Sequence, residues 1–197
     1  MAKRTGAITR ETKETRITVT WTLDGAGKAE TETGLPFLEH MLDSLARHGG
    51  FDLAVNARGD LKVDAHHTVE DLGLTLGKAL RDALRDKHGI TRFGNAVIPM
   101  DEALARVAVD ISGRPHLSYR APLPDSMAGG INARLFREFF QGLVNNAGIT
   151  VHIDLLAGDE VHHSLEAIFK AFARALAQAV RINPDTNEIP STKGALD

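Results

Sequence analysis

The residues with the clearest chemical potential are two copies of a histidine doublet followed by a glutamate, HHTVE at residues 66–70 and HHSLE at residues 162–166. On a helix, side chains three or four residues apart share a face, so each glutamate can lie beside a histidine of its own doublet. Adjacent histidines diverge by about 100°, so one doublet cannot readily place both rings on one ion. We therefore expect each histidine of a doublet to serve a different metal ion, with partners from another segment or another subunit.

A single doublet at a helix start is more often a capping or surface feature than a metal site. Two doublets in register, each with a glutamate at the same spacing, instead favour two similar sites with imidazole and carboxylate ligands. Such ligands suit manganese(II), iron(II) or zinc, among which the sequence does not choose. The pattern differs from HExxH, in which two histidines four residues apart hold a single zinc.

His40, in LPFLEHML, is a further candidate ligand. The segment PFLEHMLDSL from residue 36 matches RLFREFFQGL from residue 134, which puts Glu138 at the position equivalent to His40. Either side chain is a competent ligand, and the alternative for each is a polar residue on a solvated face.

Several cations lie in loops marked by glycine or proline: Arg92 in GITRFG, Arg114 in SGRPH and Lys193 in PSTKG. Guanidinium groups, hydroxyls and loop N–H groups together favour phosphate. Lys170 lies one turn beyond Glu166 on the same expected helix. Taken singly, each is more often a solvated cation, and STKG could equally be a frayed tail. Their meaning depends on convergence with the histidines.

Three acids complete the candidates. Glu14 is isolated before the first expected strand and is, from the residues alone, best read as a solvated carboxylate. Asp101 and Glu102, in PMDEAL, suit general acid–base chemistry or the capping of a helix or turn.

Hydrophobic periodicity predicts the elements that must position these residues. Alternation predicts a strand over 16–25 with its hairpin partner over 28–34, and strands over 51–60, 103–113 and 149–156, with 116–121 as a pairing candidate for the strand over 103–113. Helical spacing predicts helices over 36–50, 69–89, 134–148 and 162–180. Residues 123–133 are predicted to form a mobile loop, and residues 182–197 show no helical or strand periodicity.

The two halves of the chain repeat one plan, because AHHTVEDLGLTLGKALRDAL from residue 65 matches VHHSLEAIFKAFARALAQAV from residue 161. Each half is predicted to be a helix–strand–helix unit with strands before it. The expected fold class is α+β, with two fused pseudo-symmetric halves whose sheets pack against long helices.

Composition narrows the function. The 197 residues carry a net charge of −3, which argues against a general nucleic-acid binder. The absence of cysteine removes disulfides, thiolate metal sites and cysteine nucleophiles. No apolar run approaches a membrane span, and MAKRTGAITRETKETR lacks the apolar region of a secretory signal. We expect a cytoplasmic protein with neither a nucleic-acid nor a membrane partner.

Taken together, the motifs closely resemble the imidazoleglycerol-phosphate dehydratase family of histidine biosynthesis. The resemblance extends from about residue 4 to the end and rests on LPFLEHMLDSLARHGGFDL, AHHTVEDLGLTLGKAL, ITRFG, PMDEAL, DISGRP, VHHSLEAIFKAFARAL and IPSTKGAL. It implies a monofunctional single domain over 1–197, with two βαββα-type repeats over about 1–92 and 93–190 and a substrate-binding tail over 191–197.

The resemblance also implies a reaction and an assembly. The reaction is the dehydration of D-erythro-imidazole-glycerol phosphate to imidazole-acetol phosphate and water, with two manganese(II) ions per active site. The assembly is a homo-oligomer of 24 subunits with active sites shared between chains. The proton to be removed lies on a carbon without an adjacent carbonyl, so an ordinary enolate cannot form. A metal ion on the substrate imidazole would stabilise the ring anion instead.

The family resemblance implies a set of site residues, assigned motif by motif to positions in this sequence. The implied metal ligands are His40, His66, His67, Glu70, Glu138, His162, His163 and Glu166. Glu138 stands where several relatives have a histidine. The implied substrate and phosphate contacts are Glu14, Arg92, Arg114, Lys170, Ser191, Thr192 and Lys193. The implied catalytic groups are Glu14, as the acid/base that shuttles the proton, with Glu70 and Glu166.

Two other function classes fit the residues less completely. A metal-dependent hydrolase of phosphorylated or amide substrates would also use paired histidine and carboxylate sites with anion-binding loops, and would release phosphate from simple esters. A multimeric metal-storage shell would show variable metal loading and no turnover. Storage needs neither the tail motif nor the arginine motifs.

Overall fold

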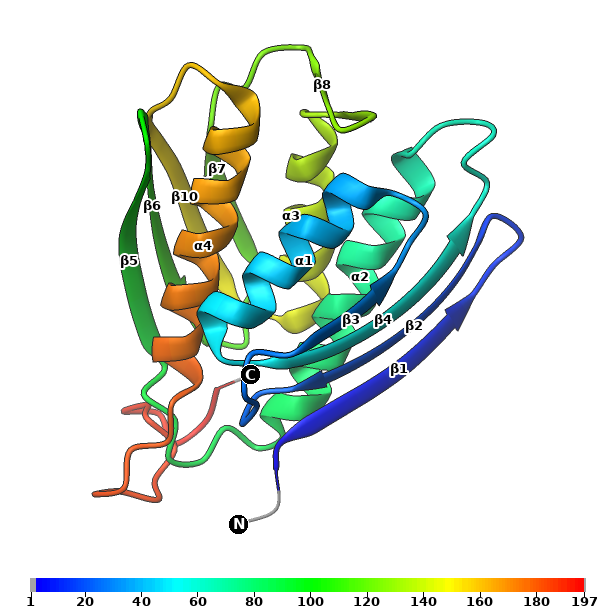
Figure 1. Ribbon diagram of the computed structural model, residues 1–197. Coiled ribbons are helices and arrows are strands. Elements are labelled where there is room, and N and C mark those ends of the chain that lie inside the picture. Colours follow the sequence, from blue (N-terminus) through cyan, green and yellow to red (C-terminus); the bar gives the residue numbers. More distant parts are fainter. Residues whose placement is uncertain (1–2, 197) are drawn as a thin grey trace.

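The computed structural model describes residues 3–196, in which two four-stranded sheets have helices between them (Figure 1). The first half contains β1 (Thr5–Glu11), β2 (Thr15–Thr22), β3 (Ala29–Glu32), α1 (Pro36–Gly49), β4 (Asp52–Gly59) and α2 (His66–Leu84). The second half contains β5 (Phe93–Met100), β6 (Ala103–Asp110), β7 (His116–Arg120), β8 (Met127–Ala128), β9 (Ile131–Asn132), α3 (Leu135–Ala147), β10 (Thr150–Ala157) and α4 (Val161–Val180).

The two four-stranded sheets have the same topology. The first has the order β1-β2-β4-β3 and the second β5-β6-β10-β7. In each sheet three strands are antiparallel, and the fourth joins parallel to its neighbour, β3 to β4 and β7 to β10. The expected α+β class with two pseudo-symmetric halves is confirmed, although each half, apart from the short β8–β9 hairpin, runs strand–strand–strand–helix–strand–helix where a βαββα order was expected.

Two predicted strand pairings are wrong. The segment over 28–34 is not the hairpin partner of β2, because β3 pairs in parallel with β4 after the chain has crossed through α1. The segment over 116–121 does not pair with the strand over 103–113, because β7 pairs in parallel with β10. Alternation reveals which face of a strand is buried but not which strand lies beside it.

Three further differences concern strands that were not predicted and the bounds of α2. β1 and β5 were not predicted, and both are edge strands with only partial burial along one face. The segment expected as a mobile loop over 123–133 contains the short antiparallel pair β8–β9. α2 begins at His66 rather than at residue 69, and a carboxylate oxygen of Asp64 accepts the His66 N–H there. It ends at Leu84 because Arg85 has a φ of 52°, outside the right-handed helix.

The helices pack across the two halves. α1 lies against α4 and α2 against α3, while α2 also covers β1 and β2 and α4 covers β5 and β6 (Figure 1). The α2–α3 contact brings the backbones close together, since a Cβ at Gly73 would lie 2.1 Å from the carbonyl oxygen of Phe139. No helix within residues 3–196 is both long enough and apolar enough to cross a membrane.

Gly73→Ala is expected to lower the free energy of unfolding by about 1–3 kcal/mol. Alanine normally favours a helix interior over glycine by about 1 kcal/mol, but here its methyl group would meet a backbone oxygen that cannot rotate away. Urea unfolding followed by circular dichroism, at one fixed protein concentration, measures the change. Lys78→Ala, at an exposed position of the same helix, is the matched control and should change little. A gain in stability from Gly73→Ala would contradict the close α2–α3 contact.

Candidate metal centre

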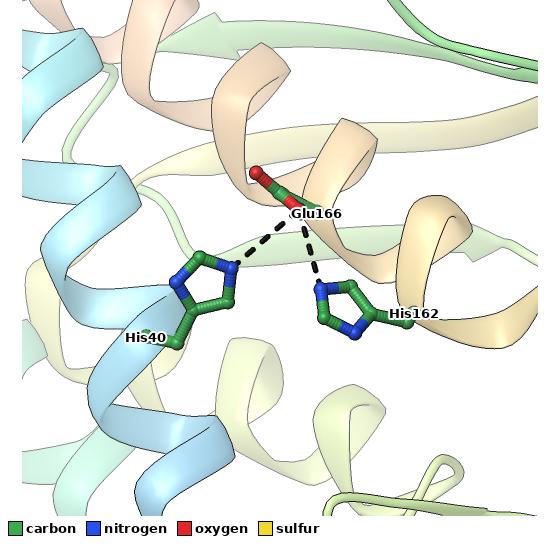
Figure 2. Close-up of side chains that lie close together, drawn as sticks. All are labelled: His40, His162 and Glu166. Atoms are coloured by element: carbon green, nitrogen blue, oxygen red, sulfur yellow. Dashed lines mark ion pairs between the residues drawn. The ribbon is translucent and has the colours of Figure 1, made fainter.

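Three side chains from two helices bring their ligand atoms together. Nε2 of His40 on α1 lies 3.5 Å from Oε2 of Glu166 on α4, and Nε2 of His162, one turn earlier on α4, lies 3.3 Å from the same oxygen. Figure 2 shows both rings turned toward this carboxylate. Within residues 3–196 this is the one group of three histidine or acidic side chains whose ligand atoms all lie within 4.8 Å of one another.

The crossed packing of the helices explains why these residues meet. α1 belongs to the first repeat and α4 to the second, so His40 reaches the doublet of the other half rather than its own. The imidazole rings of His40 and His162 are 5.5 Å apart, and the Phe37 ring stands edge-on to His162 at 5.0 Å. This aromatic contact restrains the orientation of the His162 ring.

Lys170 controls the charge of Glu166. Burial alone would raise the pKa of the Glu166 carboxyl, but the Lys170 ammonium, with Nζ 2.8 Å from Oε1, donates a hydrogen bond and lowers the pKa below its usual value. At neutral pH Glu166 is therefore an ionised acceptor with one oxygen turned to Lys170 and the other to the two histidines.

The equivalent residues of the first repeat come together less completely. Nε2 of His66 lies 3.6 Å from Oε2 of Glu70, which repeats the His162–Glu166 pair. Glu138, the counterpart of His40, is paired with Arg137 at 3.2 Å instead. It shares a face of α3 with Gly142, where a Cβ would lie 3.0 Å from the Glu70 carbonyl oxygen, so Glu138 lies on the side of α3 that faces α2. The described side chains do not join Glu138 to His66 and Glu70 as one compact group.

The second histidine of each doublet points away from the first and lies between two carboxylates. His67 places Nδ1 3.0 Å from Asp60 and Nε2 3.9 Å from Glu14. The hydrogen bond with Asp60 raises the pKa of the His67 ring. The divergence expected for adjacent histidines is therefore present, and it brings Glu14 to the edge of the first doublet.

His163 has the same surroundings in the second half. Its Nδ1 lies 2.8 Å from Glu102 and its Nε2 lies 3.9 Å from Asp101. The hydrogen bond with Glu102 raises the pKa of the His163 ring and, on the other side, lowers the pKa of Glu102 to about 2. Glu102 also accepts the backbone N–H of Glu160, which caps α4 by accepting the His163 N–H.

Arg92 lies at the far end of the molecule from the doublets. Its guanidinium donates to Asp110 and to the carbonyl oxygen of Pro190, each at 2.8 Å, and its backbone N–H donates to Ala179 in the last turn of α4. Because a helix rises about 1.5 Å per residue, Ala179 lies about 24 Å from His163.

The other predicted phosphate-binding residues, Lys170 excepted, lie near Arg92. Arg114 is exposed in the loop that follows β6, whose Asp110 end pairs with Phe93. The 191–193 segment follows Pro190, where the Ser191 hydroxyl accepts the Lys193 N–H and the Thr192 and Lys193 side chains are exposed. One chain therefore places these cations and the second histidine doublet at opposite ends of α4.

Sequence reasoning missed Asp60 and did not foresee the role of Glu102 at His163. A usable signal was present for Glu102. It stands immediately before β6 as Glu14 stands immediately before β2, so the two acids occupy equivalent turns of the two repeats. Asp60 directly follows β4 and carries no motif that would have singled it out.

Comparison with known proteins places this arrangement in a family. Residues 33–176 match the sequence model described as imidazoleglycerol-phosphate dehydratase. The chain is 57% identical over its whole length, and the whole length of the relative, to the imidazoleglycerol-phosphate dehydratase of Nitrosomonas europaea. It is 55% identical to that of Geobacter metallireducens over 98% of this chain and 99% of the relative.

Solved structures agree with the sequence comparison. The crystal structure of imidazoleglycerol-phosphate dehydratase from Staphylococcus aureus superposes with a TM-score of 0.82 at 41% identity, covering 91% of this chain and 99% of that one. The enzyme from Pyrococcus furiosus, solved in complex with (S)-C348, gives a TM-score of 0.82 at 40% identity over 96% and 100% of the two chains. The chain therefore belongs to the imidazoleglycerol-phosphate dehydratase family, which are hydro-lyases of histidine biosynthesis.

Proposed function

We propose that this chain catalyses the manganese(II)-dependent dehydration of D-erythro-imidazole-glycerol phosphate to imidazole-acetol phosphate and water, a step of L-histidine biosynthesis, in the cytoplasm. The observation that carries the proposal is the compact group of His40, His162 and Glu166 in a chain that matches its relatives from end to end.

The donor set fits the implied metal. Two imidazole nitrogens and an ionised carboxylate, in a chain without cysteine, are ligands that manganese(II) accepts. The proposal places two ions in each active site, held by His40, His66, His67, Glu70, Glu138, His162, His163 and Glu166. When bound, the ions act as Lewis acids toward the imidazole ring of the substrate and orient it.

Glu14 is the proposed proton carrier. Its carboxylate lies beside His67 but outside the compact ligand group, and its side chain is half exposed, so it can reach a substrate held at the doublets. Hydrogen bonds from the N–H groups of Glu14 and Thr15 to the Thr12 hydroxyl, and from the Thr15 hydroxyl to Asp71 on α2, fix the turn that presents it. A fixed carboxylate within reach of the reacting carbon is what general acid–base catalysis requires.

The separation of cations from histidines supports active sites shared between chains. A substrate with three carbons between its ring and its phosphate cannot bridge about 24 Å along α4. If Arg92, Arg114, Ser191, Thr192 and Lys193 bind the phosphate, they must do so for doublets of a neighbouring copy. We therefore propose a homo-oligomer with 24 subunits, the number that the family resemblance implies. In it, Lys170 is the one phosphate candidate that lies beside a doublet of its own chain.

Lys193→Ala is expected to raise the KM for the phosphorylated substrate by about 10- to 100-fold, since a hydrogen bond to a charged group contributes about 1.5–3 kcal/mol. The manganese content per chain should not change, because Lys193 lies at the end of the molecule opposite the doublets. Steady-state kinetics and metal analysis measure both quantities. Lys78→Ala, an exposed lysine on α2, is the control and should leave KM unchanged.

The decisive experiment follows imidazole-acetol phosphate formation from imidazole-glycerol phosphate with metal-stripped protein, before and after manganese(II) is added. Turnover restored by manganese supports the proposal. Folded, metal-loaded protein without turnover overturns it, and phosphate release from simple esters would favour a hydrolase instead.

A further inference from the structure

The second histidine of each doublet has an ordered carboxylate on its Nδ1 side. Asp60 lies 3.0 Å from Nδ1 of His67, and Glu102 lies 2.8 Å from Nδ1 of His163. The acids on the Nε2 side, Glu14 and Asp101, are both 3.9 Å away, which is beyond hydrogen-bonding distance. In both halves, therefore, only Nδ1 of the ring is engaged by a carboxylate.

This geometry selects one form of the neutral ring. A carboxylate accepts but does not donate, so it favours the tautomer with hydrogen on Nδ1. Nε2 then carries the free lone pair, which is the form that a metal ion can bind. A hydrogen bond from the second ring nitrogen also fixes the ring plane and increases the basicity of the ligating nitrogen.

The two halves reach this geometry with non-equivalent residues. Glu102 lies in the turn before β6 and corresponds to Glu14 in the turn before β2, yet Glu14 faces Nε2 of its histidine whereas Glu102 faces Nδ1. The first half instead uses Asp60, directly after β4. Because two unrelated positions produce one arrangement, the carboxylate on Nδ1 is more than a by-product of the repeat.

The two carboxylates differ in what else they contact. Glu102 uses its other oxygen to accept the backbone N–H of Glu160, the N-cap residue of α4, so both oxygens of its carboxylate are engaged. The second oxygen of Asp60 is buried and has no hydrogen-bond partner among the described residues, so the Asp60 carboxylate makes its hydrogen bond with His67 alone.

We propose that Asp60 and Glu102 are positioning residues that hold His67 and His163 with hydrogen on Nδ1 and present Nε2 of each ring as a metal ligand. The inference rests on the proposed function for its metal, but the tautomer it predicts is a property of the protein without metal.

The test uses magic-angle-spinning ¹⁵N spectra of metal-free, histidine-labelled protein, recorded at increasing pH until the ring signals are those of neutral imidazole. His67→Gln and His163→Gln identify the two signals. Wild-type protein should show hydrogen on Nδ1 in both rings. Asp60→Ala should shift only His67 toward the other tautomer and Glu102→Ala only His163, so each variant is the matched control for the other. Asp60→Asn keeps an oxygen acceptor and should preserve the wild-type tautomer of His67.

Manganese titration of the same proteins gives the second readout. Each alanine variant should bind manganese about 10- to 100-fold more weakly, as outer-shell partners of ligating histidines usually do, and Asp60→Asn should recover most of the loss. Unchanged tautomers in both alanine variants would overturn the inference, as would Nε2–H rings in wild-type protein. Wild-type protein that binds no manganese would overturn the proposed function. The tautomers of His67 and His163 would still be tested by the spectra of the metal-free protein.

Discussion

Glu14→Gln is expected to lower kcat for the dehydration by about 10²- to 10⁴-fold, the usual contribution of a positioned general acid or base. Glutamine keeps the size of the side chain and its hydrogen-bonding capacity but cannot take up the proton. Because Glu14 is not one of the proposed manganese ligands and its carboxylate lies 3.9 Å from Nε2 of His67, the manganese content per chain should remain that of the wild type. Single-turnover kinetics and metal analysis on the same preparation measure both effects.

The control for this variant is Glu11→Gln. Glu11 is an exposed acid at the end of β1, on the same turn of chain, and is paired with Arg16 at 3.8 Å. It should retain wild-type turnover. If Glu14→Gln lost manganese together with activity, Glu14 would be a ligand, and the proton would have to be carried by another group.

Periodicity predicted the helices better than the sheets. The apolar stripe of α4 specifies a buried face over its whole length, and the predicted bounds differ from Val161–Val180 by one residue. Strand pairing depends on which segments meet after a helix crosses the molecule, and no local pattern encodes that. The expected hairpin over 16–34 therefore failed, while the alternation that identified β2 itself was correct.

The sequence identified the histidine doublets, but not their surroundings. Internal repetition singled out His162 and Glu166 because the same spacing occurs twice. That His40 meets them follows from α1 packing on the second helix of the other repeat, a tertiary fact. The Asp60 contact with His67 was missed because its only sequence trait is its place at the end of a strand.

The placement of the phosphate candidates shows a second feature that the sequence does not predict. Gly- and Pro-marked loops made Arg92, Arg114 and Lys193 phosphate candidates whose meaning depended on convergence with the histidines, but within one chain they lie at the other end of α4 from His162 and His163. A motif does not specify whether two sites meet within a chain or between chains. The convergence remains a prediction about a neighbouring copy, which the kinetics of Lys193→Ala address.

Glu166→Gln is expected to weaken manganese binding by more than about 100-fold, the upper end for changes to outer-shell partners, and to lower turnover in proportion. The substitution keeps the side-chain volume but removes the negative charge that Lys170 maintains at neutral pH. Nε2 of His40 and Nε2 of His162 would then face an amide in place of a carboxylate oxygen, at a position only 11% exposed. Isothermal titration with manganese(II) and metal analysis of the purified protein measure the loss.

The matched control is Glu30→Gln, an exposed acid on β3, which should bind manganese as the wild type does. Thermal unfolding of metal-free protein distinguishes a lost ligand from a damaged fold, because Glu166→Gln also weakens the ion pair with Lys170. A lost ligand leaves the metal-free variant close to metal-free wild type in stability and removes the stabilisation that added manganese provides, since a ligand stabilises only the state that binds it. If Glu166→Gln retained full manganese affinity and turnover, the group formed by His40, His162 and Glu166 would not be the metal centre, and the proposed function would lose the observation on which it stands.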